Sequence, residues 1–260
     1  MSLREWLSAF QRGDLSRAEL RQRLQSLGEG GGAADTSLSE GQQGLWMLQS
    51  AQPRSYAYNI PICLGLSGPL DPQALQAACI ETLRAHPALA AAVVERDGRP
   101  QRRGVAAETL PFALHDARTL SEADLHETMS ARLREPFALD RGPFMRADLY
   151  ARGQDSWTLL IVVHHIAFDG GSVDAFMHTL CAAYERAAGG AAQADLATTA
   201  TTATTAAGFA DFVRWERDYV ASAAGEAALD YWLRTLDGAQ PALGDGDRAP
   251  RRPRTVRHAL

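Results

Sequence analysis

Two adjacent histidines, His164 and His165, follow the apolar run WTLLIVV, and the residues IAFDGGS come directly after them. An imidazole with a pKa near neutrality can take a proton from an attacking amine or hydroxyl while a tetrahedral intermediate forms. Successive side chains of a strand point to opposite faces, so we expect one histidine to be structural and the other to line a cavity. This pattern is typical of acyl transfer with a histidine base, and the sequence has no GxSxG nucleophile turn.

The residues behind the histidines predict a tight connection from a strand to a helix. Asp169 should lie in the turn, since it comes four residues after His165. Gly170 and Gly171 would permit tight backbone angles there and leave room for a substrate close to the backbone. Ser172 is expected to cap the helix that follows, which is indicated by apolar residues at helical spacing between 173 and 184.

Two other interpretations of the histidine pair remain open at this point. The pair could be buried and structural, with an aspartate that only caps a helix. A metal site would need three or four convergent ligands, and the remaining histidines show no ligand spacing. We therefore expect no bound metal and no directly bound cofactor. His178 is expected on an exposed helix face, and the other four are His86, His115, His126 and His258.

Composition excludes several classes of protein. The 260 residues are 46% hydrophobic and 22% charged with a net charge of −5, which is ordinary globular composition and unlike a nucleic-acid-binding surface. No apolar stretch approaches the roughly 18 residues of a membrane span, and the N-terminus does not resemble a signal peptide. A cytoplasmic protein is expected. Its three cysteines, predicted to be buried reduced thiols, are Cys63, Cys79 and Cys181.

The chain divides by pattern into four segments. Residues 1–28 predict two short helices that form an appendage and a possible docking segment, and 29–36 are a glycine-rich linker. Residues 37–240 form the main body, which includes a low-complexity surface insertion at 191–207. Residues 241–260 predict an irregular tail.

The main body predicts a mixed α/β fold, a mixed and mostly antiparallel sheet covered by helices. Strands 143–151 and 157–164 should form an antiparallel hairpin, and the second is apolar on both faces, so it should be central. The other predicted strands and helices do not follow strict βαβ alternation. They are a helix within 37–51, a strand at 58–68, a helix after Asp71, a strand and turn at Asp97-Gly98, a helix from Ser121 to about Arg134, and helices at 208–224 and 226–238.

The stretch VHHIAFDGGS resembles the HHxxxDG signature of the condensation domains of nonribosomal peptide synthetases, which have the chloramphenicol acetyltransferase-like fold. Other stretches resemble family motifs in the family's order, over about residues 37–240. They are SEGQQGLWML, YNIP with LSGPLDPQALQAA, EPFALDRGPFMRADL, FADFVRWE and LDYWLRTLDG. The resemblance implies the N-terminal lobe of such a domain.

The resemblance also implies roles for the residues of the signature. His165 would be catalytic, as a general base or as a positioning and electrostatic group for attack of an amine on a thioester. His164 and Asp169 would be structural, Asp169 through an ion pair with an arginine, for which Arg146 is our candidate. Gly170 would mark where the substrate arm passes.

The implied partners are upstream and downstream carrier proteins, whose phosphopantetheine arms hold the acyl donor and the acceptor amine. The product would be an amide, or less often an ester, in a nonribosomal peptide or a hybrid polyketide-peptide. Residues 1–28 would receive the donor from a separate upstream synthase. The chain lacks the C-terminal lobe that the family has, so we expect it to be inactive alone.

One departure from the family pattern keeps alternatives open. The segment AHPALAAAV retains His86 but has Ala90 where an arginine is expected. This departure and the missing lobe both favour a competing interpretation, a non-catalytic carrier-protein docking module. A related acyltransferase with a free alcohol or amine acceptor also stays open, as does an epimerising relative, since such relatives keep HHxxxDG.

Overall fold

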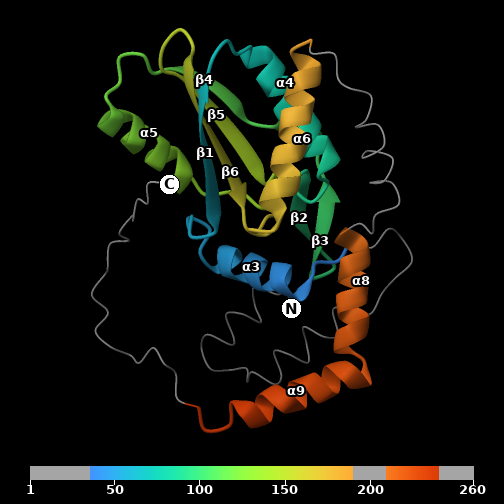
Figure 1. The fold of residues 1–260 in the computed structure, drawn as a ribbon. Coiled ribbons are helices and arrows are strands. Elements are labelled where there is room, and N and C mark those ends of the chain that lie inside the picture. The colour runs from blue at the N-terminus through green and yellow to red at the C-terminus, as the bar shows by residue number, and fades with distance from the viewer. Residues whose placement is uncertain (1–35, 190–208, 240–260) are drawn as a thin grey trace. The chain divides into compact units, whose positions relative to one another are not determined.

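The computed structural model describes residues 36–189 and 209–239 (Figure 1). The chain divides into two compact units after Arg217, within helix α8 (Phe209–Val220), and each unit is described by itself. The predictions for residues 1–28, 191–207 and 241–260, and for nearly all of the linker, fall outside the described residues.

The centre of the first unit is a four-stranded sheet. It contains β1 (Asn59–Ser67), β4 (Phe112–Asp116), β5 (Met145–Ala151) and β6 (Ser156–His164), in the order β1-β6-β5-β4. β6 is antiparallel to both of its neighbours, and only the pair of β4 and β5 is parallel. The predicted hairpin and the central place of its second, apolar strand are confirmed.

The strands β2 (Ala91–Arg96) and β3 (Arg99–Gly104) form a hairpin of their own. Asp97 and Gly98 make its turn with φ angles of 51° and 75°, because a two-residue turn with positive φ at both positions matches the twist of the strands. The turn was predicted correctly. Within the named sheets β2 and β3 pair only with each other, so this hairpin is separate from the four-stranded sheet, which is mixed and mostly antiparallel as predicted.

Helices cover both faces of the four-stranded sheet. α5 (Glu122–Arg134) lies on the face that carries Asp148, because its Arg132 bonds that carboxylate. Met145, Ala147 and Leu149 of β5 point to the other face and are fully buried. On that side α4 (Pro72–Ala85) and α6 (Ser172–Ala187) pack against each other (Figure 1).

Two further elements belong to the first unit. α3 (Glu40–Ala51) begins with a capping box of Ser39 and Gln42, and a 3-10 turn spans Ala107–Thr109. In the second unit, α9 (Ala223–Thr235) confirms the last predicted helix. Its apolar residues stay exposed, among them Trp232 at 57%.

The prediction of three buried thiols was wrong for two of them. Cys79 is buried in α4, whereas Cys63 and Cys181 are exposed. Cys63 lies on β1, an outer strand of the sheet whose alternate side chains face outward, so an apolar sequence context did not imply burial.

Gly142 brings the chain that leads into β5 close against β2. Its φ is 64°, and a Cβ at this position would lie 2.1 Å from the carbonyl oxygen of Ala91. The backbone around it is paired with the chain before and within β2: Val93 N–H donates to the Leu139 carbonyl at 2.7 Å, and Phe144 N–H donates to that of Leu89 at 2.9 Å. This contact therefore fixes where β5 begins.

We expect Gly142→Ala to lower the free energy of unfolding by about 3 kcal/mol or more, since it adds left-handed strain to a backbone clash. Urea denaturation measures this. The control is Gly104→Ala, at which an added Cβ meets nothing within 4 Å. Equal losses in the two variants would contradict the close approach.

Candidate active site

His164 ends β6 as a buried, structural residue. It is 1% exposed, and its backbone N–H donates to the Phe144 carbonyl at 3.0 Å. Its ring lies among aromatic neighbours: the ring centroid of Phe137 is 5.8 Å away in an edge-on arrangement, and those of Tyr58 and Phe144 are 6.3 and 6.4 Å away. An imidazole in these surroundings packs as part of the core.

A hydrogen bond sets the tautomer of His164, and burial sets its charge. Its Nδ1 accepts from the backbone N–H of Ile166 at 3.1 Å, so Nδ1 is unprotonated. Burial, together with the charge of the neighbouring His165, lowers the pKa of His164 to about 4. At neutral pH the ring is therefore uncharged and carries its proton on Nε2.

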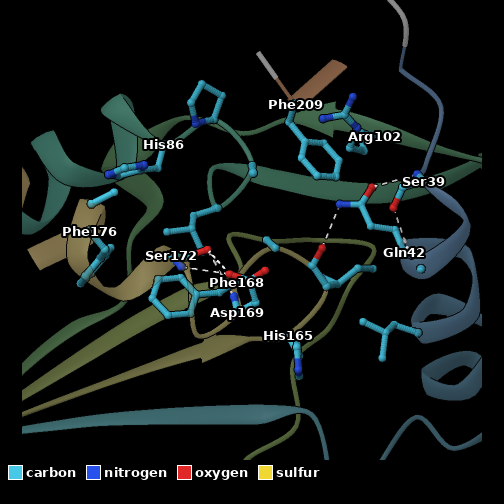
Figure 2. A pocket seen from close by; sticks show the side chains of 18 of the residues that line it. Ser39, Gln42, His86, Arg102, His165, Phe168, Asp169, Ser172, Phe176 and Phe209 are labelled. Carbon is cyan, nitrogen blue, oxygen red and sulfur yellow. Dashed lines mark hydrogen bonds between the residues drawn. The ribbon is translucent and has the colours of Figure 1, made fainter. Parts of the chain in front are cut away.

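His165 lies just beyond the strand and is exposed. Its backbone N–H donates to the Tyr58 carbonyl at 2.9 Å, so the main chain is held while the side chain lines a cavity (Figure 2). The two histidines thus separate into one buried and one accessible residue, but His165 lies in the turn, so the turn and not strand alternation separates them.

The cavity has a volume of about 1240 Å³ and receives residues from six parts of the chain. These parts are the start of α3, the end of α4 with the segment after it, β3 through Arg102, the turn after β6, the first turns of α6 and the start of α8. Its lining is mainly apolar, with a few polar groups near His165, a composition typical of ligand sites. The labelled polar and aromatic lining residues include Gln42, His86, Phe168, Asp169, Phe176 and Phe209 (Figure 2).

Asp169 does not pair with Arg146. Its Oδ1 accepts from the hydroxyl of Ser172 at 2.7 Å and from the backbone N–H of Ser172 at 3.0 Å. These hydrogen bonds lower the pKa of Asp169. The predicted ion pair is therefore wrong: Asp169 closes the turn before α6, and Arg146 lies on β5 with other partners.

The glycines and Ser172 also differ in detail from the prediction. The N-cap residue of α6 is Gly171, and Ser172 is the first helical residue. The φ of Gly171 is −71°, and a Cβ at Gly170 would meet nothing within 4 Å, so the turn itself does not require glycine at either position for its backbone angles. Open space beside Gly170 is compatible with a ligand passing there.

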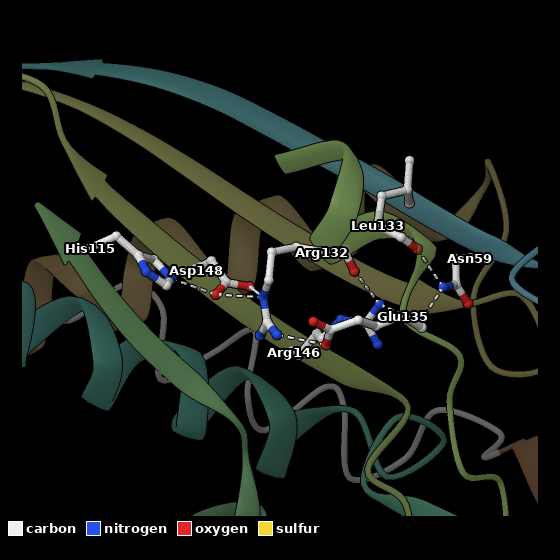
Figure 3. A network of polar contacts seen from close by, with 7 residues as sticks. All are labelled: Asn59, His115, Arg132, Leu133, Glu135, Arg146 and Asp148. Atoms are coloured by element: carbon white, nitrogen blue, oxygen red, sulfur yellow. Dashed lines mark hydrogen bonds and ion pairs between the residues drawn. The ribbon is translucent and has the colours of Figure 1, made fainter. Parts of the chain in front are cut away.

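Arg146 binds the C-terminal end of α5 (Figure 3). Its Nη2 donates to the carbonyls of Arg132 and Glu135, each at 2.7 Å, and Asn59 Nδ2 donates to those of Leu133 and Glu135 at 2.7 and 2.8 Å. Helix C-termini leave such carbonyls without partners and carry partial negative charge. A buried guanidinium is therefore a favourable cap for this helix.

Arg146 also reaches the histidine pair through an aromatic ring. Its guanidinium carbon lies 4.3 Å from the ring centroid of Phe137, and Phe137 contacts the ring of His164 edge-on. Arg146 is thus linked to His164 through Phe137, and its side-chain hydrogen bonds go to carbonyls of α5 and of the residue after it.

A second polar contact holds α5 on the sheet. The fully buried carboxylate of Asp148 accepts from His115 Nε2 at 2.7 Å and from Arg132 Nε at 3.0 Å (Figure 3). A buried carboxylate needs such partners to remain charged. This network lies on β5 beyond Arg146, and its residues do not line the cavity.

Sequence reasoning missed Gln42. The side chain is 6% exposed, and its Nε2 donates to the carbonyl oxygen of Ile166 at 2.8 Å (Figure 2). The pattern Ser39-x-x-Gln42 at the start of a helix predicts the capping box. It does not predict a contact with a residue 124 positions away.

The condensation-domain family model matches residues 33–257, most of the chain. The chain belongs to the condensation-domain family. The solved structures it resembles agree with the predicted fold. The chain has a TM-score of 0.67 and 25% identity to the first condensation domain of the calcium-dependent antibiotic synthetase, solved with a substrate analogue. It has a TM-score of 0.66 and 20% identity to the starter condensation domain of rhizomide synthetase.

Curated relatives are large synthases. The chain is 34% identical over 206 residues to polyketide synthase PksN of Bacillus subtilis, covering 79% of this chain and 4% of that protein. It is 32% identical over 219 residues to a linear gramicidin synthase of Brevibacillus parabrevis, covering 82% and 3%. The matches to both solved domains cover 79% of this chain and 48% of theirs, so the chain spans about half the length of the solved condensation domains.

The segment with the unusual Ala90 adjoins the cavity of this condensation domain. His86 ends α4, and its Nε2 lies 3.1 Å from the hydroxyl of Thr179 on α6. Burial lowers the pKa of His86, which favours the neutral ring. Ala90 is half-buried just before β2. Among residues 36–189 and 209–239, no cluster of ligands could hold a metal ion, and no helix is long and apolar enough to cross a membrane.

The pKa of His164 predicts how the stability of the condensation domain depends on pH. The folded pKa of about 4 is below the ordinary value of 6.5, so the unfolded chain binds this proton first as the pH falls. The contribution of the neutral His164 ring to the free energy of unfolding is fully present above pH 6.5. It is lost as the pH falls to 4, a change on the order of 3 kcal/mol. Urea midpoints at about pH 7, 5.5 and 4 measure it.

The matched variant is His164→Asn, whose Oδ1 can still accept from Ile166 N–H but does not titrate. At about pH 7 this variant should be less stable than the wild type, because the ring packing is lost. Between pH 6.5 and 4 it should lose less stability than the wild type does. Parallel losses in the wild type and the variant would show that other groups cause the acid sensitivity.

Proposed function

We propose that this chain forms one wall of the active site of a condensation domain that joins an acyl group to an acceptor amine, with His165 as the catalytic residue. One observation carries the proposal: His165 lines a cavity of about 1240 Å³ while His164, next to it, is buried and neutral. A single imidazole is thereby made available to a ligand with its backbone held by hydrogen bonds.

The proposed reaction needs one proton transfer at this position. The acceptor amine attacks the thioester carbon, and His165 either takes the proton from the nitrogen or stabilises the charge that develops. The C–S bond then breaks, the N–C bond remains as the amide, and the thiol leaves with a proton. An ester would form in the same way from an alcohol.

The proposed substrates are thioesters on the phosphopantetheine arms of donor and acceptor carrier proteins. Relatives that are large peptide and polyketide synthases support this, as does a cavity large enough to receive a long arm. The open space beside Gly170 supports passage of an arm there. Residues 1–28 are proposed to contact a separate upstream synthase.

The second half of the cavity is proposed to come from a C-terminal lobe, because the solved condensation domains are about twice as long as the matched part of this chain. Residues 1–260 alone should then be inactive. Ala90 favours a second candidate, a carrier-protein docking module without catalysis. A related acyltransferase with a free acceptor is distinguished by its ability to use an unloaded amine or alcohol.

The test is transfer in the full-length domain, supplied with its own donor and acceptor carrier proteins, each loaded on phosphopantetheine. His165→Ala should reduce the transfer rate by about 100-fold or more, since general-base catalysis contributes about 10²–10⁴-fold. Mass spectrometry of the acyl group on the acceptor carrier protein measures it.

The control is His178→Ala, which removes an exposed histidine from α6 and should leave the rate unchanged. Full transfer by His165→Ala would reject the catalytic role. Binding of a carrier protein with no transfer by the unmodified full-length domain would favour the docking module.

A further inference from the structure

Gln42 uses both ends of its side-chain amide in different parts of the structure. Its Oε1 accepts from the backbone N–H of Ser39 at 3.3 Å, which completes the capping box of α3. Its Nε2 donates to the carbonyl oxygen of Ile166, one residue after His165, at 2.8 Å. The residue is 6% exposed, so water competes little for either bond.

The contact with Ile166 completes the restraint of the turn that carries His165. The peptide group between His164 and His165 makes two hydrogen bonds. The N–H of His165 donates to the Tyr58 carbonyl, and the carbonyl of His164 accepts from the Ala167 N–H at 3.1 Å. After His165, the Ile166 N–H donates to the ring of His164. Peptide groups on both sides of His165 are therefore bonded to fixed partners, and Gln42 supplies the bond from α3.

We infer that Gln42 is a positioning residue for His165: its amide fixes the Ile166 peptide and thereby sets the direction in which the imidazole meets the substrate. The inference rests on the proposed catalytic role of His165. The inference gives α3 a second function. The same Gln42 side chain caps this helix and orients His165 through the Ile166 peptide.

The expected effect is on the rate of the chemical step. A displacement of about 1 Å in a reacting group can cost on the order of 100-fold in rate, even when the displaced group still binds. Loss of the Gln42 bond should therefore lower kcat about 10- to 100-fold. KM for the acceptor carrier protein should be unchanged, because Gln42 is 6% exposed and both ends of its amide are bonded within the chain, although the residue adjoins the cavity.

Two variants separate positioning from helix capping. Gln42→Glu keeps an acceptor for Ser39 N–H, and glutamate is a usual capping-box residue, but it has no donor for the Ile166 carbonyl. Gln42→Met keeps the volume and loses both bonds. The matched control is Gln43→Met, which removes an equivalent bond, from Gln43 Nε2 to the Leu38 carbonyl at 3.3 Å, one residue further along the helix.

The assay is the same carrier-protein transfer with the full-length domain, and thermal unfolding is followed in parallel. Both Gln42 variants should lose kcat and Gln43→Met should not. Loss in Gln42→Met alone would show that only the cap matters and would overturn the inference. Hydrogen exchange should show faster exchange at Ile166 and Ala167 in both variants, with exchange in β5 unchanged, even if the global stability falls.

A double mutant connects the two residues. If Gln42 acts through His165, adding Gln42→Glu to His165→Ala should not lower the residual transfer further. An equal loss in both backgrounds, or unchanged kcat and exchange in the single Gln42 variants, would overturn the positioning role. Full transfer by His165→Ala would instead reject the proposed function, so the two failures are distinguishable.

Discussion

The hydrogen bond from Ile166 N–H to the buried ring of His164 is the constraint on which the site depends. It requires an uncharged imidazole, which burial among aromatic rings enforces, and it turns the chain away from the strand directly after His165. A protonated His164 would be a buried cation whose Nδ1 could no longer accept. The accessibility of one histidine therefore follows from the neutrality of the other.

The surroundings of His164 explain why residues far from the cavity matter. Phe137 reaches the ring because the segment after α5 is held in place, and Arg146 and Asn59 hold it by binding the last carbonyls of that helix. The cation stays buried without a carboxylate bonded directly to it, since several carbonyls at a helix C-terminus offer partial negative charge. The aromatic packing around His164 and the hydrogen bonds of Arg146 thus lie on the same face of the sheet.

Local patterns made most of the fold predictable. The hairpin of β5 and β6, the Asp97-Gly98 turn and the helix starts at Asp71 and Ser121 follow from periodicity and from short-range hydrogen bonds, and these were predicted. Strand alternation predicted that His164 and His165 would point to different sides, whereas in the structure His165 already lies in the turn after the strand. Long-range partners were not predictable: Arg146 was assigned to Asp169, and Gln42 was given no contact, because each finds its partner through tertiary packing.

Preorganisation explains why an exposed residue would need so many fixed neighbours. An imidazole in contact with water gains little catalytic strength from its surroundings, so its contribution depends on being correctly directed before the substrate arrives. Here Tyr58 just before β1, His164 at the end of β6 and Gln42 of α3 each provide partners for the turn, and the entropy of ordering it is lost when the chain folds. The side chain of His165 retains its freedom only about its own rotatable bonds. A ligand that fills the apolar cavity then has to order one side chain and no backbone.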